Sequence, residues 1–533
     1  MKFLDKLSSS TALVPLNPTP ISEQPDTSAR ENLYYASWIT VIFLIVCGYG
    51  AMNHEMWRDE IQAWLLARDS TSFIDLLANM KYEGHPALWH LCLMPLSRIS
   101  VSPIMMQVFH LLIAATTVFL FNRYAPFNRL HKFLFSFGYF ALYEYGIVVR
   151  NYAIGLMLIT IFCVLYNQRY RRFIWIGIVL FLTCHTSVHA LIVVIAIWCG
   201  LLCEFLLFYC CKENAPWKSI HPVWIGFTLI GIGIVTAVLQ LNPPPDTGFA
   251  VGWNFNFTVQ RMNNMVKIIT NALLPFTKAA MGHWGNMQLH SYPIFQKYRL
   301  LLSYLIIFWC VLRFLKRPTS LFIYLIATIG LLSFFYVKYG GSMRHHGFLL
   351  ITFVMTSWIY YDAPEFKFPL DIISVYAQRC FSAIFMVFLI FHFMGGMNSL
   401  SMDTQYIFSN GKRTAEYIKA ENLEDLPMVG ITDFAISTVV GYLGKDRIYY
   451  PQGSRYGSFV RWDKARTHGV SNEQVIEAAK QISAENSEDV LLILNRNLPD
   501  ELIEENSLTL LKQFTGSTIG DEGFRLYLLK KSL

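Results

Sequence analysis

Apolar runs long enough to cross the hydrocarbon layer of a bilayer recur in this chain from Tyr34 to Gly396 and then stop. With 54% hydrophobic and only 15% charged residues, a soluble fold would lack the polar side chains needed to cover its surface. The sequence therefore predicts a polytopic α-helical membrane domain over residues 34–396. Residues 397–533 follow with the charge and the helix and strand patterns of a small soluble α/β domain.

Charge and cysteine usage fit this division. The segment from Met397 onward holds 15 basic and 19 acidic residues while the whole chain is at +7, so the positive charge belongs to the membrane domain. The ten cysteines lie between Cys47 and Cys380 in or beside apolar segments, which indicates neither a disulfide framework nor a zinc site. Residues 1–33 are polar with four prolines and predict a disordered cytoplasmic leader. The apolar run after them lacks a small-residue cleavage site and should stay attached as the first span.

Short loops rich in Lys and Arg mark the cytoplasmic side of a membrane protein. They occur here at 123–132, 169–172, 212–218, 313–317 and 367–379. With these loops inside, eleven spans are predicted, at 34–52, 103–121, 133–149, 151–167, 173–189, 190–210, 221–241, 298–315, 318–337, 345–361 and 379–396. The regions then predicted to lie outside are 53–102, 149–152, 242–297, 338–346 and the tail. A twelfth crossing at 85–100 would invert every later loop, and Pro95 interrupts that short segment, so an interfacial helix is predicted there.

The tail alternates as an α/β unit. "PMVGITD" and "DVLLILN" predict buried strands, "FRLYLLKK" a closing strand, and "SNEQVIEAAKQISAE" a helix with Ser471 as N-cap. Neither a Walker loop nor a GxGxxG fingerprint is present, so we expect no nucleotide site and no nucleic-acid partner.

The stretch after the first span opens with the adjacent acids Asp59 and Glu60, close to the predicted membrane surface. Apolar side chains fall at helical spacing beside them and predict an amphipathic helix in the headgroup layer: Trp57, Ile61, Trp64 and Leu65. Under one interpretation the acids are solvated or paired with Arg58. Under the other, desolvation and the neighbouring charge raise the pKa of Asp59 toward that of a general base.

Glu83 and His85 stand two residues apart in the same loop, followed by Pro86. This spacing can hold a divalent cation or contact a phosphate, and the alternative is a polar turn that starts a helix. His185 and His189 are four apart, which places them on one helix face either as core histidines or as ligands of a metal or acceptor.

Cations are also predicted at the outer face. Arg150, followed by Tyr152, lies at a span boundary, where an arginine either anchors the helix or clamps a phosphate. "KYGGSMRHHG" gathers positive groups in one external turn, whose two glycines suit close approach to an anion; a solvated loop is the alternative. These groups are Lys338, Arg344, His345 and His346. Trp253, Asn254 and Trp284 either line an acceptor cavity or anchor the chain at the interface.

At these residues the sequence resembles the GT-C superfamily of membrane glycosyltransferases, particularly the branch of protein O-mannosyltransferases and lipid A aminoarabinose transferases. The resemblance rests on the Asp59-Glu60 pair, on Glu83 with His85 and Pro86, on the R-x-Y at 150–152 and on the eleven-span layout. It implies that Asp59 is the base that activates the acceptor and that Arg150 and Arg344 bind the polyprenyl phosphate. Some members bind a metal through a nearby Glu, which here would be Glu83.

We therefore expect an inverting glycosyltransferase of the plasma (inner) membrane that moves a hexose or pentose from a polyprenyl-phosphate donor. The acceptor is an extracytoplasmic glycan, glycolipid or protein, and a divalent metal ion is left open as a cofactor. The expected catalytic acids are Asp59 and Glu60. The residues expected at the donor phosphate are Arg150, Tyr152, Arg344, His345, His346 and His85. Those expected at a metal or acceptor site are Glu83, His185 and His189.

Two other classes of protein remain open. A transporter or lipid-linked sugar flippase would place ionisable groups near the bilayer midplane, where the sequence offers only Glu144 and Glu204 well inside predicted spans. A non-catalytic scaffold would use the tail as a docking domain.

Overall fold

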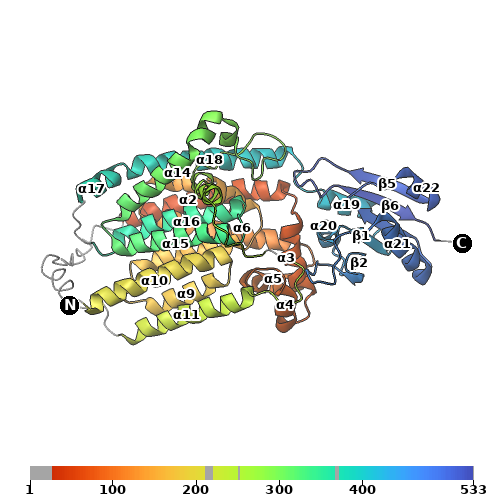
Figure 1. Ribbon diagram of the computed structural model, residues 1–533, viewed down its shortest axis with the longest axis horizontal. Coiled ribbons are helices and arrows are strands. Elements are labelled where there is room, and N and C mark those ends of the chain that lie inside the picture. Colours follow the sequence, from red (N-terminus) through yellow and green to blue (C-terminus); the bar gives the residue numbers. More distant parts are fainter. Residues whose placement is uncertain (1–26, 211–219, 250–251, 366–370, 532–533) are drawn as a thin grey trace.

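The computed structural model describes residues 27–210, 220–249, 252–365 and 371–531. Figure 1 shows a helical bundle at one end, a small domain containing a β-sheet at the other, and short helices between them. The predicted fold class, a polytopic helical membrane domain followed by a C-terminal α/β domain, is confirmed. Most of the predicted leader and the basic loop 212–218 lie outside the described residues, as does part of the loop 367–379.

Seven helices among the described residues are long and apolar enough to cross a membrane. They are α2 (Thr27–Asn53), α6 (Ile104–Tyr124), α10 (Val188–Cys210), α11 (His221–Leu241), α14 (Pro293–Phe314), α15 (Pro318–Val337) and α18 (Phe381–Gln405). Residues 27–33, predicted to belong to a disordered leader, form the first turns of α2, so that part of the prediction is wrong. The apolar run of this span extends helix formation back into its polar flank.

The other predicted spans fall on shorter helical segments. These are α8 (Tyr152–Tyr166), α9 (Phe173–Cys184), α16 (Met343–Ile359) and the pair α7 (Arg129–Ser136) and η1 (Tyr139–Ile147). The span predicted at 133–149 is thus not one continuous α-helix. Gly138 has extended backbone after α7, and the chain continues as a π-helix. The sidedness of the bundle stays a prediction.

The remaining helices of the membrane domain cap or connect the bundle. They are α3 (Arg58–Asp69), α4 (Phe73–Met80), α5 (Leu88–Ile99), α12 (Val259–Val266), α13 (Ile268–Leu273), η2 (Gln288–Ser291), η3 (Tyr360–Asp362) and α17 (Asp371–Arg379). The segment 85–100 is helical over α5 only, too short to cross the hydrocarbon layer, as predicted. In Figure 1, α3, α4 and α5 lie where the bundle meets the C-terminal domain.

The C-terminal domain is a six-stranded sheet in the order β3-β2-β1-β4-β6-β5. Its elements are α19 (Gly411–Ala420), β1 (Met428–Ile431), α20 (Asp433–Leu443), β2 (Ile448–Tyr450), β3 (Arg455–Gly457), α21 (Asn472–Asn486), β4 (Val490–Leu494), α22 (Asp500–Glu505), β5 (Leu508–Phe514) and β6 (Phe524–Leu529). Strands β2, β1 and β4 are parallel, while β6 pairs antiparallel with β4. The predicted strands at 427–433, 489–495 and 524–531 are confirmed. So is the Ser471 cap, whose hydroxyl accepts from the Gln474 N–H.

One face of this sheet is turned toward the membrane domain. Helices α19 and α20 cover that face and α21 covers the other, so each face has its own apolar core. Helix α20 packs directly on α3, the helix that carries the Asp59-Glu60 pair. The tail is therefore in contact with the candidate site.

Candidate active site

Helix α3 is buried in protein rather than spread over the membrane surface. Its predicted apolar face, Ile61, Trp64 and Leu65 with Trp57 ahead of it, is 0–5% exposed. Helices α5 and α20 pack against α3, and the indole of Trp64 donates to the carbonyl oxygen of Val101. The prediction that this face lies in the headgroup layer is wrong. Helix α20 of the C-terminal domain packs on α3, and the sequence gives no sign of this contact.

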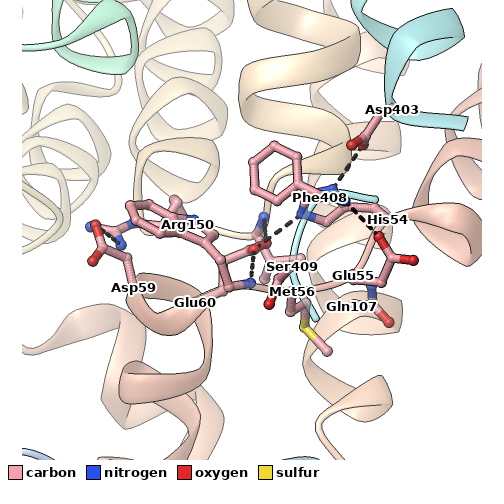
Figure 2. Close-up of polar contacts among 12 residues, drawn as sticks. His54, Glu55, Met56, Asp59, Glu60, Gln107, Arg150, Asp403, Phe408 and Ser409 are labelled. Carbon is pink, nitrogen blue, oxygen red and sulfur yellow. Dashed lines mark hydrogen bonds and ion pairs between the residues drawn. The ribbon is translucent and has the colours of Figure 1, made fainter. Parts of the chain in front are cut away.

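The Glu60 side chain is turned away from that of Asp59 and is fully buried. One carboxylate oxygen accepts from the backbone N–H of Trp57 at 3.0 Å and contacts the His54 ring nitrogen at 3.1 Å. The other accepts from the backbone N–H of Val149 at 2.5 Å. Glu60 therefore caps α3 and ties it to the segment that presents Arg150, which is a positioning role (Figure 2).

His54 continues this network to the last long helix. Its other ring nitrogen lies 2.8 Å from the carboxylate of Asp403, near the end of α18. Burial favours the neutral ring, but the carboxylates of Asp403 and Glu60 outweigh burial and raise the pKa of His54 well above 6.5. His54 is thus an imidazolium held between two buried carboxylates.

We expect His54→Gln to destabilise the protein by about 3–5 kcal/mol, because it leaves two buried carboxylates without their cation. The pKa of His54 is higher in the folded protein than in the unfolded chain. Its stabilising contribution is therefore complete below about pH 6.5 and is lost as the pH rises through the folded-state value. Thermal melting of the detergent-solubilised proteins should show a difference that is largest in mild acid and shrinks in alkali. A difference that does not vary with pH would contradict this account.

Asp59 meets two arginines from distant parts of the chain. Its Oδ2 atom lies 3.0 Å from Nη1 of Arg150 and 3.1 Å from Nη2 of Arg344. Arg150 comes just before α8 and Arg344 from the first turn of α16, so three separate elements meet at one oxygen atom. The Asp59 side chain is 30% exposed, and those of Arg150 and Arg344 are 8% and 13% exposed. The carboxylate therefore lies at an opening in an otherwise buried cationic site.

The pKa of Asp59 is lowered, contrary to the predicted rise. Burial alone would raise it, but the charges of Arg150, Arg344 and Arg58 outweigh burial. The predicted contribution of the neighbouring acid is also missing, because Glu60 is turned away toward His54. With these guanidiniums beside it, Asp59 is therefore a weak base.

Two indole rings hold the Arg344 guanidinium. Its carbon lies 5.4 Å from the ring centroid of Trp57 and 5.4 Å from that of Trp284. Nε of Arg344 and Nε1 of Trp57 are buried without a hydrogen-bond partner among the described residues. Such donors are costly to leave unpaired and are suited to an anion. We call Asp59, Arg150, Arg344, Trp57 and Trp284 the Asp59 cluster.

Among the other predicted phosphate contacts, His345 and His85 lie beside Tyr152. The hydroxyl of this fully buried tyrosine lies 2.9 Å from a ring nitrogen of His345, whose other ring nitrogen accepts from the Ser342 N–H. His346 bonds to the carbonyl oxygen of Gly340 at 3.1 Å. His85 is the nearest of these groups to the Asp59 cluster, at 3.5 Å from Nη2 of Arg150, and burial together with that cation lowers its pKa to about 3. His85 is therefore neutral.

His185 and His189 do not share a helix face. Helix α9 ends at Cys184 and α10 begins at Val188, so a turn separates the two rings and the i, i+4 prediction is wrong. His185 contacts Thr236 of α11, whereas His189 stacks on His345 with 4.7 Å between ring centroids. The pair cannot act as joint ligands in this arrangement.

Glu83 lies in the loop between α4 and α5, where its Oε1 accepts from the Gln62 amide at 2.8 Å. Burial and the charge of Asp59 raise its pKa to about 7, against the lowering effects of Gln62 and Arg150. The described residues contain no group of three or more His, Cys, Asp or Glu side chains that could hold a metal ion. The surroundings of Glu83 therefore do not fit the metal site that the family resemblance implies, and no reaction step is assigned to a metal.

Several solved structures are similar to this chain, and ArnT is one of them. ArnT from Cupriavidus metallidurans, solved with bound undecaprenyl phosphate, is similar over 94% of this chain and 98% of its own, with 10% sequence identity and a TM-score of 0.49. No protein-family model and no curated protein sequence matches the chain.

Proposed function

We propose that this protein is an integral-membrane glycosyltransferase that moves a sugar from a polyprenyl-phosphate donor to an extracytoplasmic acceptor. The observation that carries the proposal is the meeting of Asp59, Arg150 and Arg344 at one opening. Two guanidiniums and one carboxylate leave an excess of positive charge, which suits the phosphate of a lipid-linked donor. The unpaired N–H groups of Arg344 and Trp57 add hydrogen-bond donors for the same anion.

In the proposed reaction the acceptor oxygen or nitrogen attacks the anomeric carbon from the face opposite the phosphate, which inverts the configuration. The bond from that carbon to the phosphate oxygen breaks, and the lipid phosphate leaves with the electron pair. Arg150 and Arg344 neutralise the charge that develops on it. Both arginines contact Oδ2 of Asp59, so Oδ1 is the oxygen that we assign to receive the proton of the acceptor.

Donor binding would make Asp59 a better base. The guanidiniums that lower its pKa are the groups that the donor phosphate would engage. Once their charge is shared with the phosphate, the pKa of Asp59 rises back toward its ordinary range. Proton transfer is thereby confined to the state in which the sugar is already in place.

The proposal is tested by supplying the purified full-length protein with a panel of polyprenyl-phosphate sugars. Release of free lipid phosphate, together with a glycosylated acceptor, is the expected result for at least one donor. Movement of the lipid across reconstituted vesicles without sugar transfer would instead favour the flippase class. Against that class, both acids well within predicted spans have fixed partners: Glu144 accepts from Trp284, and Glu204 pairs with Arg169 at 2.8 Å.

A further inference from the structure

The C-terminal domain contacts α3 on both sides of Asp59 in the sequence. A side-chain oxygen of Glu522 accepts from the backbone N–H of Arg58 at 3.0 Å, and Asp521 pairs with the Arg58 guanidinium. Glu522 is completely buried, and burial raises its pKa to about 8 against the opposing effects of a Ser409 hydrogen bond and the Arg58 charge. A residue of the tail therefore holds the first residue of α3, directly before Asp59.

The second contact fixes Gln62, one turn further along α3. Its amide oxygen accepts from the Val460 N–H at 3.0 Å, and its amide nitrogen donates to the Val460 carbonyl oxygen at 2.8 Å. Because the backbone of Val460 has one donor and one acceptor, this pair sets the orientation of the amide unambiguously. The remaining N–H of Gln62 points to Glu83.

Between these two contacts, α20 packs on α3 without room for a methyl group. A Cβ atom at Gly441 would lie 2.4 Å from Cγ2 of Ile61. Ile61 is fully buried and β-branched, so its side chain cannot turn aside, and one of the two helices would have to move. The position of α3 is thus set by the tail at Arg58, Ile61 and Gln62.

The phosphate-binding side chains are carried by other elements. Arg344 comes from α16 and Arg150 from the segment before α8, and neither element is held by these three contacts. We propose that the C-terminal domain is a positioning part of the active site, in which Glu522, Val460 and Gly441 set the place of Asp59 relative to a donor bound by Arg150 and Arg344. This inference rests on the proposed transferase function and gives the tail a role within it.

The test compares Gly441→Ala and Glu522→Ala in the full-length protein. We expect kcat per donor-binding site to fall about 10- to 100-fold, as a displacement of about 1 Å at a reacting group does, while the Kd for the lipid phosphate stays within about twofold. Glu522→Gln should restore most of the rate, because its amide oxygen can accept from the Arg58 N–H. Gly520→Ala is the matched control, since its methyl group meets nothing within 4 Å.

Titration with the lipid phosphate counts the binding sites. It therefore distinguishes a lower kcat per site from a smaller amount of folded protein. Fewer binding sites with an unchanged kcat per site would overturn the inference, as would an unchanged rate in both variants. Hydrogen exchange gives a reading that does not depend on transfer: the α3 amides should exchange faster in Gly441→Ala than in Gly520→Ala. If the unchanged protein transfers no sugar, the proposed function fails. If the α3 amides exchange equally fast in Gly441→Ala and Gly520→Ala, the positioning inference fails.

Discussion

Asp59→Asn is expected to remove sugar transfer, with a loss of at least about 100-fold in kcat, while the protein still folds and binds the lipid phosphate. The asparagine is nearly isosteric but cannot take the acceptor's proton. It also removes the carboxylate that competes with the phosphate for Arg150 and Arg344, so donor affinity should be equal or higher. Initial rates at saturating donor, with Kd values from lipid-phosphate titration, measure the two effects separately.

Asp75→Asn is a suitable control for this change. Asp75 lies in the first turn of α4, outside the Asp59 cluster. Its side chain accepts a hydrogen bond from the Thr71 N–H, and an asparagine can accept the same bond. It should transfer at the rate of the unchanged protein. Turnover that persists in Asp59→Asn would refute the assigned base while leaving the phosphate site untouched.

Arg344→Ala is expected to weaken donor binding by about 2 kcal/mol or more, which is about 30-fold in Kd. The guanidinium is largely buried, lies between two indole rings and has an unpaired Nε, so its removal takes away charge, stacking and hydrogen bonds together. Arg344→Lys keeps the charge but not the planar guanidinium. Its donor affinity should lie between those of Arg344→Ala and the unchanged protein. The measurement is binding of a polyprenyl phosphate to the detergent-solubilised proteins.

The pH profile gives a second readout of the same variant. Losing Arg344 removes one of the charges that lower the pKa of Asp59, so the residual activity should depend on pH in a more alkaline range than that of the unchanged protein. Arg129→Gln breaks an exposed ion pair with Glu31 and should change neither affinity nor profile. Donor affinity that is equal in Arg344→Ala and the unchanged protein would remove Arg344 from the phosphate site.

The bundle and the tail were predictable because both depend on periodic patterns. Apolar runs locate the long helices, and the tail reveals its strands and the Ser471 cap through local sequence alone. The approach of Asp59 to Arg150 and Arg344 followed from topology, since the predicted spans place all three at the same outer face. The sequence therefore predicts which residues come close together, but not the contacts that each of them makes.

The predictions that failed concern features that depend on packing between residues far apart in the sequence. His54 and Asp403 are 349 positions apart, and nothing local distinguishes them from solvated polar residues at span ends. Adjacent helix residues point about 100° apart, so Asp59 and Glu60 could not share one environment once α3 was packed on two sides. The rise predicted for the pKa of Asp59 assumed that they did. Likewise, a turn between Cys184 and Val188 was enough to separate two histidines that a continuous helix would align.

The bridge from Asp403 through His54 and Glu60 to Val149 also bears on when the protein becomes competent during its synthesis. Asp59, Arg150 and Arg344 all leave the ribosome before Asp403, yet the groups that hold α3 in place come from the end of α18 and from the C-terminal domain. A nascent or prematurely ended chain would therefore carry every reactive side chain without the framework that aligns them. Under the proposed function, neither kind of chain would transfer sugar.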